Sequence, residues 1–159
     1  KEDIVKLYKV DLDFSKLTPE NVMYVAPLNI GIASVQSLSV KAGGETDVMT
    51  LRHDGESVTT YLNGTELSLT DFSSIYYKYI ALNADGFETG QADPGEWAAT
   101  CTTTLVNGET VELSLYERDA DTYYLFVDGQ MLKTGQTAFY MPKSSLEELI
   151  YRLKSVKGV

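Results

Sequence analysis

GGETDVMTL, residues 43–51, returns as NGETVELSL at residues 107–115. Each stretch holds a turn and the tripeptide Gly-Glu-Thr, followed by apolar residues at every second position. That alternation is the period of a strand with one buried face. The recurrence predicts that a strand hairpin, and the unit built around it, occurs twice in the chain.

The second copy carries the clearer signals. Asn107-Gly108 and Asp128-Gly129 predict two-residue hairpin turns, because such turns need residues that accept positive φ. A helix is predicted after the last strand. Ser144 and Glu147 form its expected capping box, and Gly158 suits its C-terminal cap.

The first copy follows the same order. Its turns are predicted at 43–44, 54–55 and 63–64, and a helix follows with Asp71 as its N-cap and Gly86 as its end. A stretch rich in Gly and Asp then separates the two copies.

These units predict an α+β fold. We expect a tandem repeat of an antiparallel β-meander followed by an α-helix, with two main helices packed on a mostly antiparallel sheet. The predicted boundaries are an N-terminal arm at 1–33, repeat 1 at 34–86, a linker at 87–96 and repeat 2 at 97–159. The way in which the two repeats pack stays open.

Charge excludes some partners. The 159 residues carry 13 Lys and Arg against 23 Asp and Glu, a net charge of −10. A chain of this charge repels a phosphate backbone and anionic lipid headgroups. We therefore expect no nucleic-acid partner.

The sequence contains no candidate membrane span. Its longest mostly apolar stretch, residues 22–35, is interrupted by Pro27, Asn29 and Gly31 and is shorter than the roughly 20 residues that a spanning helix needs. The chain opens on Lys1 without a signal region. We expect a mature fragment whose targeting or tethering segment has been removed.

Three segments carry a resemblance to a known family. They are SVQSLSV (34–40), TTYLNGTELSLTDFSSIYYKYIAL (59–82) and TYYLFVDGQMLKTGQTAFYMPKSSLEELIYRLKSV (122–156). With their turns and apolar periodicity, these segments resemble a bacterial and archaeal domain-of-unknown-function family, number 4340, over most of residues 34–158. Its members look like duplicated strand-meander-and-helix units.

The resemblance implies an extracytoplasmic location, in lipoproteins or membrane-anchored proteins of the cell envelope or surface. Some relatives lie beside ABC-type exporters or gliding-motility auxiliary subunits. The family supplies no catalytic residue that could be carried over to this chain.

Nucleophilic and metal chemistry have few candidates. His53 is the single histidine and Cys101 the single cysteine. A histidine metal site needs partners that the chain lacks, and Cys101 lies in a Thr-rich run that predicts a small buried side chain. We predict no catalytic residue, no metal site and no cofactor, and we expect a protein that is not an enzyme.

Paired acids offer a calcium hypothesis. Asp11 with Asp13 and Asp119 with Asp121 could supply oxygen ligands, but neither pair continues into a calcium-binding loop. Asp119 and Asp121 are better explained as turn residues that bond to local backbone.

Aromatic residues are the compositional excess, with eleven tyrosines and one tryptophan. Most of the tyrosines fall in predicted strands or helices, where packing alone explains them. If some are exposed, they could stack on sugars or line a peptide groove. The candidate ligand-binding residues are Trp97, Tyr61 and Tyr124.

These observations leave three functional hypotheses. The first is a non-catalytic envelope module that binds a protein partner, acting as an auxiliary part of an ABC-type transport or surface assembly, with pairing at a sheet edge as its mechanism. The second is a glycan- or peptide-binding module that uses exposed tyrosines and Trp97. The third is a hydrolase that uses two of the many carboxylates.

Overall fold

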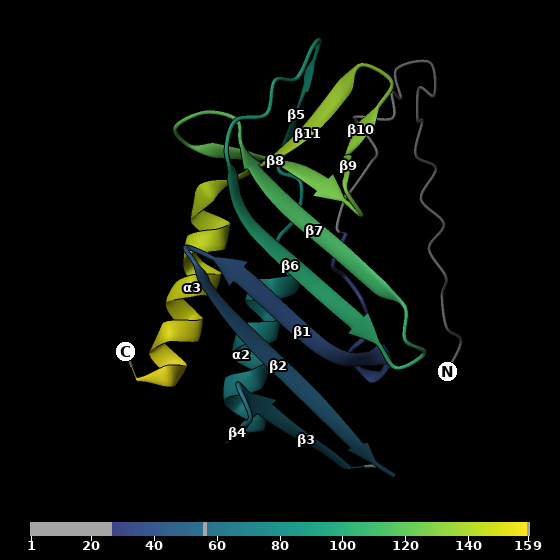
Figure 1. Cartoon of the computed structure of the whole chain (residues 1–159), viewed down its shortest axis with the longest axis vertical. Helices are drawn as coiled ribbons and strands as arrows, with labels where there is room; N and C mark the ends of the chain where they lie inside the picture. The colour runs from purple at the N-terminus through teal and green to yellow at the C-terminus, as the bar shows by residue number, and fades with distance from the viewer. Residues whose placement is uncertain (1–26, 56, 159) are drawn as a thin grey trace, which may run out of the picture.

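The computed structural model describes residues 27–55 and 57–158. It contains one large antiparallel sheet and two helices, α2 (Leu69–Ile80) and α3 (Lys143–Lys157), so the predicted α+β class is confirmed (Figure 1). Most of the predicted N-terminal arm, including Asp11 and Asp13, lies outside the described residues.

The sheet has eleven strands. Its path runs β10-β11-β8-β7-β6-β1-β2-β3-β4, with β5 paired to β11 and β9 paired to β8. A short 3-10 helix, η2 (Ile32–Ser34), precedes the first strand. The strands are β1 (Val35–Ala42), β2 (Glu45–Asp54), β3 (Ser57–Leu62), β4 (Thr65–Leu67), β5 (Gly86–Thr89), β6 (Trp97–Leu105), β7 (Thr110–Glu117), β8 (Thr122–Val127), β9 (Gln130–Met131), β10 (Lys133–Thr134) and β11 (Thr137–Pro142).

The two halves of the chain meet at the centre of this sheet. Strand β1 of the first half pairs antiparallel with β6 of the second, and Val40 lies opposite Cys101 in this seam. Outward from the seam, the first half continues through β2, β3 and β4 into α2. The second half continues through β7, β8 and β11 into α3.

Each half contains a turn with the same backbone conformation and the same side-chain hydrogen bond. Asn63 and Asp128 both have positive φ, at 50° and 49°. The Asn63 Oδ1 accepts a hydrogen bond from the Val48 N–H at 2.8 Å, and the Asp128 Oδ1 accepts one from the Glu112 N–H at 2.9 Å. These matching contacts favour a tandem repeat, which stays a prediction.

The turn at Asn107-Gly108 differs from the two-residue turn that the sequence predicts. The Leu105 N–H donates to the Glu109 carbonyl at 2.8 Å, so three residues form the loop. Gly108 has a φ of 87°, whereas the positive φ values of the described non-glycine residues belong to Asn63 and Asp128. One glycine in the left-handed region is enough for a three-residue hairpin.

The helix starts also differ from the expected caps. Ser68, not Asp71, is the N-cap of α2, and its Oγ accepts a hydrogen bond from the Asp71 N–H at 3.1 Å. Helix α3 follows β11 directly, with Pro142 as its N-cap and no side-chain cap, so the predicted capping box of Ser144 and Glu147 is wrong. The Asp121 carbonyl accepts a hydrogen bond from the Lys143 N–H at 2.8 Å. The predicted C-cap of α3 is confirmed, since Gly158 is left-handed with a φ of 76°.

Helix α2 ends at Ile80, before the predicted end at Gly86. Gly86 instead opens β5, which lies mostly within the predicted linker and pairs with β11 of the second half. The segment between the halves therefore takes part in the sheet.

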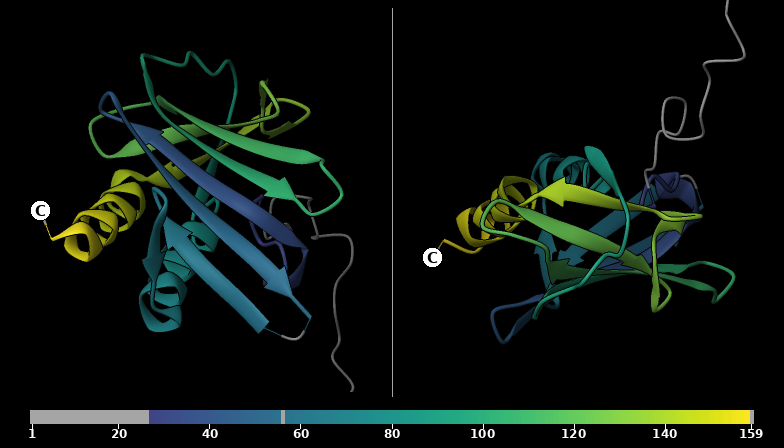
Figure 2. Two further views of the ribbon diagram at one scale, coloured as in Figure 1. Left: turned by 60° about the horizontal axis from the view of Figure 1, so that its bottom comes forward. Right: turned by 90° about the horizontal axis from the view of Figure 1, so that it is seen from above.

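One core serves both halves. It lies between one face of the sheet and the two helices, which lie on the same side of the central strands (Figure 2). Its largest fully buried side chains come from both halves and from both helices: Leu28, Leu38, Met49, Phe72, Ile75, Tyr79, Leu82, Leu113, Leu115, Leu125, Met141 and Leu149. No helix of the described residues covers the other face of the central strands.

Candidate functional site

The uncovered side of the central strands is the main candidate surface. We call it the open face and define it by the side chains of β1, β2, β6 and β7 that lie on the side opposite the core; all of them except the buried Ser114 are exposed or half-buried. Cross-strand partners place them on one side of the sheet. The members are Ser37, Ser39, Lys41, Thr46, Val48, Thr50, Arg52, Asp54, Trp97, Thr100, Thr102, Thr104, Thr110, Glu112, Ser114 and Tyr116.

Hydroxyl groups dominate the open face. More than half of its members are Ser or Thr, and Val48 is its aliphatic member. Its two cations, Lys41 and Arg52, balance its two carboxylates, Asp54 and Glu112. The open face is thus charge-balanced in a chain whose net charge is −10.

Trp97 lies at one corner of the open face, with 40% of its surface exposed. Its Nε1 donates to the Thr100 Oγ1 at 2.9 Å, and this hydroxyl lies 2.9 Å from the Ser114 Oγ. Ser114 in turn donates to the Glu112 Oε1 at 3.3 Å. This chain of hydrogen bonds fixes the indole ring while leaving part of it open to a ligand.

An aromatic row extends from Trp97 across the neighbouring strands. Tyr116 lies opposite Trp97 on β7, and its ring centre is 4.6 Å from that of Phe126 on β8. The Lys41 Nζ lies 5.6 Å from the centre of the Trp97 ring. We call Trp97, Tyr116 and Phe126 the aromatic row.

Tyr61 lies on the same side of the sheet but at a different corner. Its partner across the strands is Thr50, and the Arg52 guanidinium lies 4.8 Å from its half-buried ring. Thr50 lies opposite Ser37 of β1, which lies opposite Thr104 of β6. Thr104 and Trp97 are seven residues apart on β6, which separates them by about 23 Å along the strand. The structure therefore brings Trp97 and Tyr61 to one side of the sheet but not to one site.

Tyr124, the third candidate ligand-binding residue, is buried in the structure. Only 4% of its surface is exposed. Its hydroxyl donates to Glu88, and the Arg118 guanidinium lies 5.9 Å from its ring. The strand pattern identified Tyr124 as an aromatic strand residue but carried no information on β5, which supplies Glu88.

Glu88 and Arg118 fasten β5 to the sheet. The Arg118 Nη2 and Nε donate to the Glu88 Oε2 at 2.5 and 3.0 Å, and the Arg118 guanidinium lies 4.2 Å from the Tyr140 ring. The hydrogen bonds from Arg118 lower the pKa of the Glu88 carboxyl, and the hydrogen bond from Tyr124 lowers it further. The Glu88 carboxylate binds both the Arg118 guanidinium and the Tyr124 hydroxyl, so we assign this cluster a structural role.

Cys101 and His53 do not form a catalytic pair. The Cys101 side chain is fully buried in the seam, and this burial raises the pKa of its thiol to about 12. His53 lies opposite Val58 near the end of β2, six residues along this strand from the cross-strand line of Cys101, and its Nε2 is 3.0 Å from the Val35 carbonyl oxygen. Within residues 27–55 and 57–158, no cluster of three or more potential ligands could hold a metal ion.

Asp119 has the turn role that the sequence predicts. Its Oδ1 accepts hydrogen bonds from the N–H groups of Asp121 at 2.9 Å and Thr122 at 2.8 Å. These bonds lower the pKa of the Asp119 carboxyl, the bond from Asp121 most strongly. The carboxylate is therefore occupied by local backbone.

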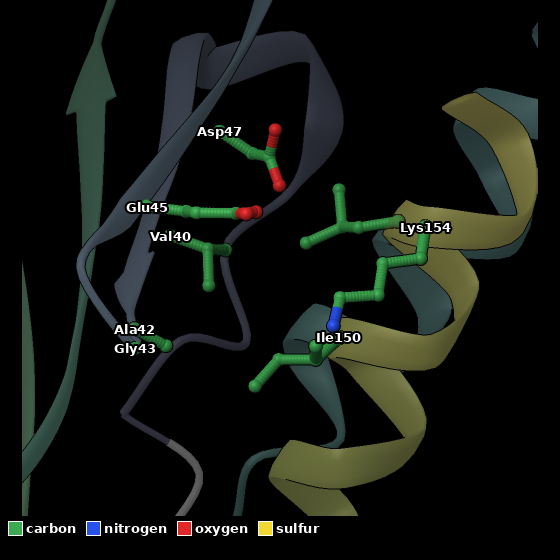
Figure 3. Close-up of a pocket in the computed structure, with 8 residues that line it drawn as sticks. Val40, Ala42, Gly43, Glu45, Asp47, Ile150 and Lys154 are labelled. Carbon is green, nitrogen blue, oxygen red and sulfur yellow. The ribbon is translucent and has the colours of Figure 1, made fainter. Parts of the chain in front are cut away.

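A cavity of about 210 Å³ lies between the β1–β2 turn and α3 (Figure 3). Val40, Ala42, Ile150 and Leu153 form its apolar wall, and Glu45, Asp47 and Lys154 contribute charged groups. Cavities that hold small ligands usually measure roughly 300–1,000 Å³. This one is small for a ligand site.

The buried carboxylate at this cavity already has partners. The Lys157 Nζ lies 3.0 Å from each oxygen of Asp47, and the Asn63 Nδ2 donates to it at 2.8 Å. Lys157 thereby ties the last turn of α3 to β2, so we assign Asp47 a structural role.

The two ends of the sheet offer little backbone for strand addition. Strands β4 and β10, at the two ends of the strand path, have three and two residues, and β5, which pairs with β11 beside that path, has four. Short edge strands are a common protection against pairing with another chain. The predicted edge-pairing mechanism thus has weaker support than contact through the open face.

Comparisons with known proteins give no relative. No protein-family model matches the chain, and no similar chain was found among curated proteins or solved structures. The resemblance to family 4340 therefore stays a prediction.

The sequence reasoning selected Trp97 but missed its surroundings. Thr100, Thr102 and Thr104 alternate with the buried Ala99, Cys101 and Thr103, so the hydroxyl-bearing side of β6 could have been predicted from its period of two. No local signal indicated that this side would remain uncovered, since that depends on where the helices pack.

Proposed function

We propose that this chain is a non-catalytic binding module of the cell envelope that holds a macromolecular ligand on the open face. The observation that carries this proposal is the position of Trp97. It lies partly exposed on a broad side of the sheet, and its indole N–H is fixed by Thr100. Exposed and orientationally fixed aromatics on a rigid sheet are typical of binding surfaces.

The chemistry of the described residues supports binding more than catalysis. The Cys101 thiol is buried with a raised pKa, so little of it would be in the nucleophilic thiolate form. The Glu88 carboxyl, whose pKa is lowered, is held by Arg118, which leaves it poorly suited to act as a general acid.

The envelope location rests on the resemblance to family 4340. It implies a tethered, extracytoplasmic protein, auxiliary to an ABC-type transport or surface assembly. None of the described helices is long and apolar enough to cross a membrane.

Photo-crosslinking in native cells tests the proposal. A photoreactive amino acid is placed at Thr102 on the open face and, in a matched variant, at Tyr151 on the outer side of α3, where 75% of the side chain is exposed. We expect a reproducible high-mass adduct from position 102 only, in the envelope fraction. Adducts from position 151 alone, or from neither position, would contradict the proposal.

A second candidate is a protein partner on the helices. Leu69 and Tyr77 of α2 and Tyr151 of α3 are all more than half exposed, and large exposed apolar side chains on helices suit a protein interface. The crosslink from position 151 would then be the productive one, and its mass would identify a protein.

A further inference from the structure

We infer that the ligand of the open face is an uncharged glycan whose pyranose rings stack along the aromatic row. This inference rests on the proposed function, since it names the ligand class of the same surface. It follows from three properties of the site, which are its hydroxyl content, its charge balance and the placement of its aromatics.

The hydroxyl content separates a glycan from a protein partner. The centres of protein interfaces are enriched in aromatic residues, Met and Arg and depleted in Ser, Lys and Glu. Between Trp97 and Tyr61 the open face instead presents rows of Ser and Thr side chains, with Val48 as the aliphatic member. Hydroxyl groups both donate and accept, which matches the alternating donors and acceptors of a sugar chain.

Charge complementarity favours a neutral ligand. Lys41 and Arg52 balance Asp54 and Glu112 on the open face, whereas the chain as a whole carries −10. Anionic polymers would be repelled by that net charge, and a cationic one would meet no local excess of carboxylates on this face. An uncharged polyhydroxylated ligand fits both conditions.

The aromatic row supplies the stacking surface. Trp97, Tyr116 and Phe126 come from three neighbouring strands, so the row spans two strand spacings, or about 10 Å. The flat C–H side of a pyranose ring packs on an aromatic face, and the fixed indole needs little reordering to receive it. Lys41, which lies over the same indole, would have to move aside for a ring to bind there.

Trp97 is the single tryptophan of the chain, so its fluorescence reports on this site alone. The protein is titrated with two neutral ligands, the β-1,4-linked hexamers of glucose and of N-acetylglucosamine. An oligogalacturonate serves as the negatively charged comparison ligand. We expect a saturable change in tryptophan emission with at least one neutral hexamer and none with the oligogalacturonate.

Calorimetry on variants then locates the site. Trp97→Ala should weaken binding at least about tenfold, the usual scale for truncating an aromatic anchor, and Trp97→Phe should retain part of it. Tyr151→Ala, which removes an exposed aromatic from the opposite side of the molecule, should bind as the unaltered protein does.

Thermal unfolding of each variant confirms that loss of binding is not loss of folding. Failure of both neutral hexamers to bind, equal affinity of Trp97→Ala and the unaltered protein, or binding of the oligogalacturonate alone would overturn the inference. A protein adduct from position 102 in the crosslinking experiment, combined with no glycan binding, would overturn the glycan while leaving the binding module intact.

Discussion

Gly86 allows the ring of Tyr140 to lie against the backbone of β5. A Cβ added at Gly86 would lie 2.4 Å from the Tyr140 Cζ, far inside van der Waals contact. The Tyr140 ring cannot simply retreat, because the Arg118 guanidinium lies 4.2 Å from it and is itself bound to Glu88. The position therefore requires glycine for reasons of space.

We expect Gly86→Ala to lower the free energy of unfolding by about 1–3 kcal/mol, the usual effect of overpacking. Gly31→Ala is the matched control, because Gly31 has a φ of −63° and a Cβ added there would meet no atom within 4 Å. Urea denaturation of both variants measures the difference. Equal stability of the two variants would mean that β5 shifts freely on the sheet.

Glu88 predicts a pH-dependent contribution to stability. Its pKa is lowered in the folded protein, first by the hydrogen bonds from Arg118, so folding favours the ionised form. That contribution is complete above the unfolded-state pKa, near 4.5, and is lost as the pH falls through the folded-state pKa. Stability from this group is therefore lost in acid.

Replacing the carboxyl exposes this dependence. Glu88→Gln should be less stable than the unaltered protein by about 1 kcal/mol at pH 7, and this difference should shrink as the pH falls below the unfolded-state pKa of 4.5 and through the lower folded-state pKa. Glu148→Gln is the control, because the Glu148–Lys78 pair is largely exposed and should contribute less. Denaturant unfolding curves between pH 3 and pH 7 measure this difference in unfolding free energy. A difference that does not change with pH would refute the stabilising role of the Glu88–Arg118 ion pair.

At the scale of elements, α3 is fastened to the sheet at its last turn. Lys157 lies within 3.0 Å of both Asp47 oxygens, and Asp47 is buried. Removal of the ammonium would leave that carboxylate with the Asn63 amide and without its cation. A buried charge that loses its partner is strongly unfavourable.

Lys157→Met should therefore cost about 1–3 kcal/mol of unfolding free energy. Lys154→Met is the matched control, since Lys154 is one turn away, exposed and without an ion pair among the described residues, and should change stability by less than about 0.5 kcal/mol. Chemical denaturation compares the two. If both variants lose the same amount, general helix effects and not the Asp47 contact explain it.

The sequence predicted these elements well wherever local chemistry decides their structure. Asp128-Gly129 and Gly158 adopt positive φ as expected, and the apolar spacing located both helices. The errors arose where tertiary contacts decide. Strand β5 exists because β11 offers it a pairing edge, and Tyr124 is buried because β5 brings Glu88 to it. Neither fact has a local signal, because the partners are more than 30 residues apart.

At the scale of the whole molecule, the seam between β1 and β6 makes the two halves depend on each other. Seven residue pairs join these strands, from Val35 with Leu105 to Ala42 with Ala99, and one core underlies both halves. Either half alone would expose a long central strand edge and the apolar side of its sheet. The two halves therefore share one sheet and one core.

We expect that two fragments expressed separately, residues 27–84 and residues 85–159, do not unfold cooperatively. Mixing the two fragments should restore some native structure. Circular dichroism during heating measures both. The intact chain supplies the control, and its slowest-exchanging amides should lie in β1 and β6, because opening them requires global unfolding. A cooperative transition in an isolated half would show that the seam is not required.

Cys101 gives the seam a chemical reporter. It is the single thiol of the chain and is fully buried between the two halves. A thiol reagent can reach the Cys101 side chain only when the core between the sheet and the helices opens, so the rate of modification measures how often this core opens. Compared with the rate in denaturant, it would yield the opening free energy in unlabelled protein under native conditions, without any substitution.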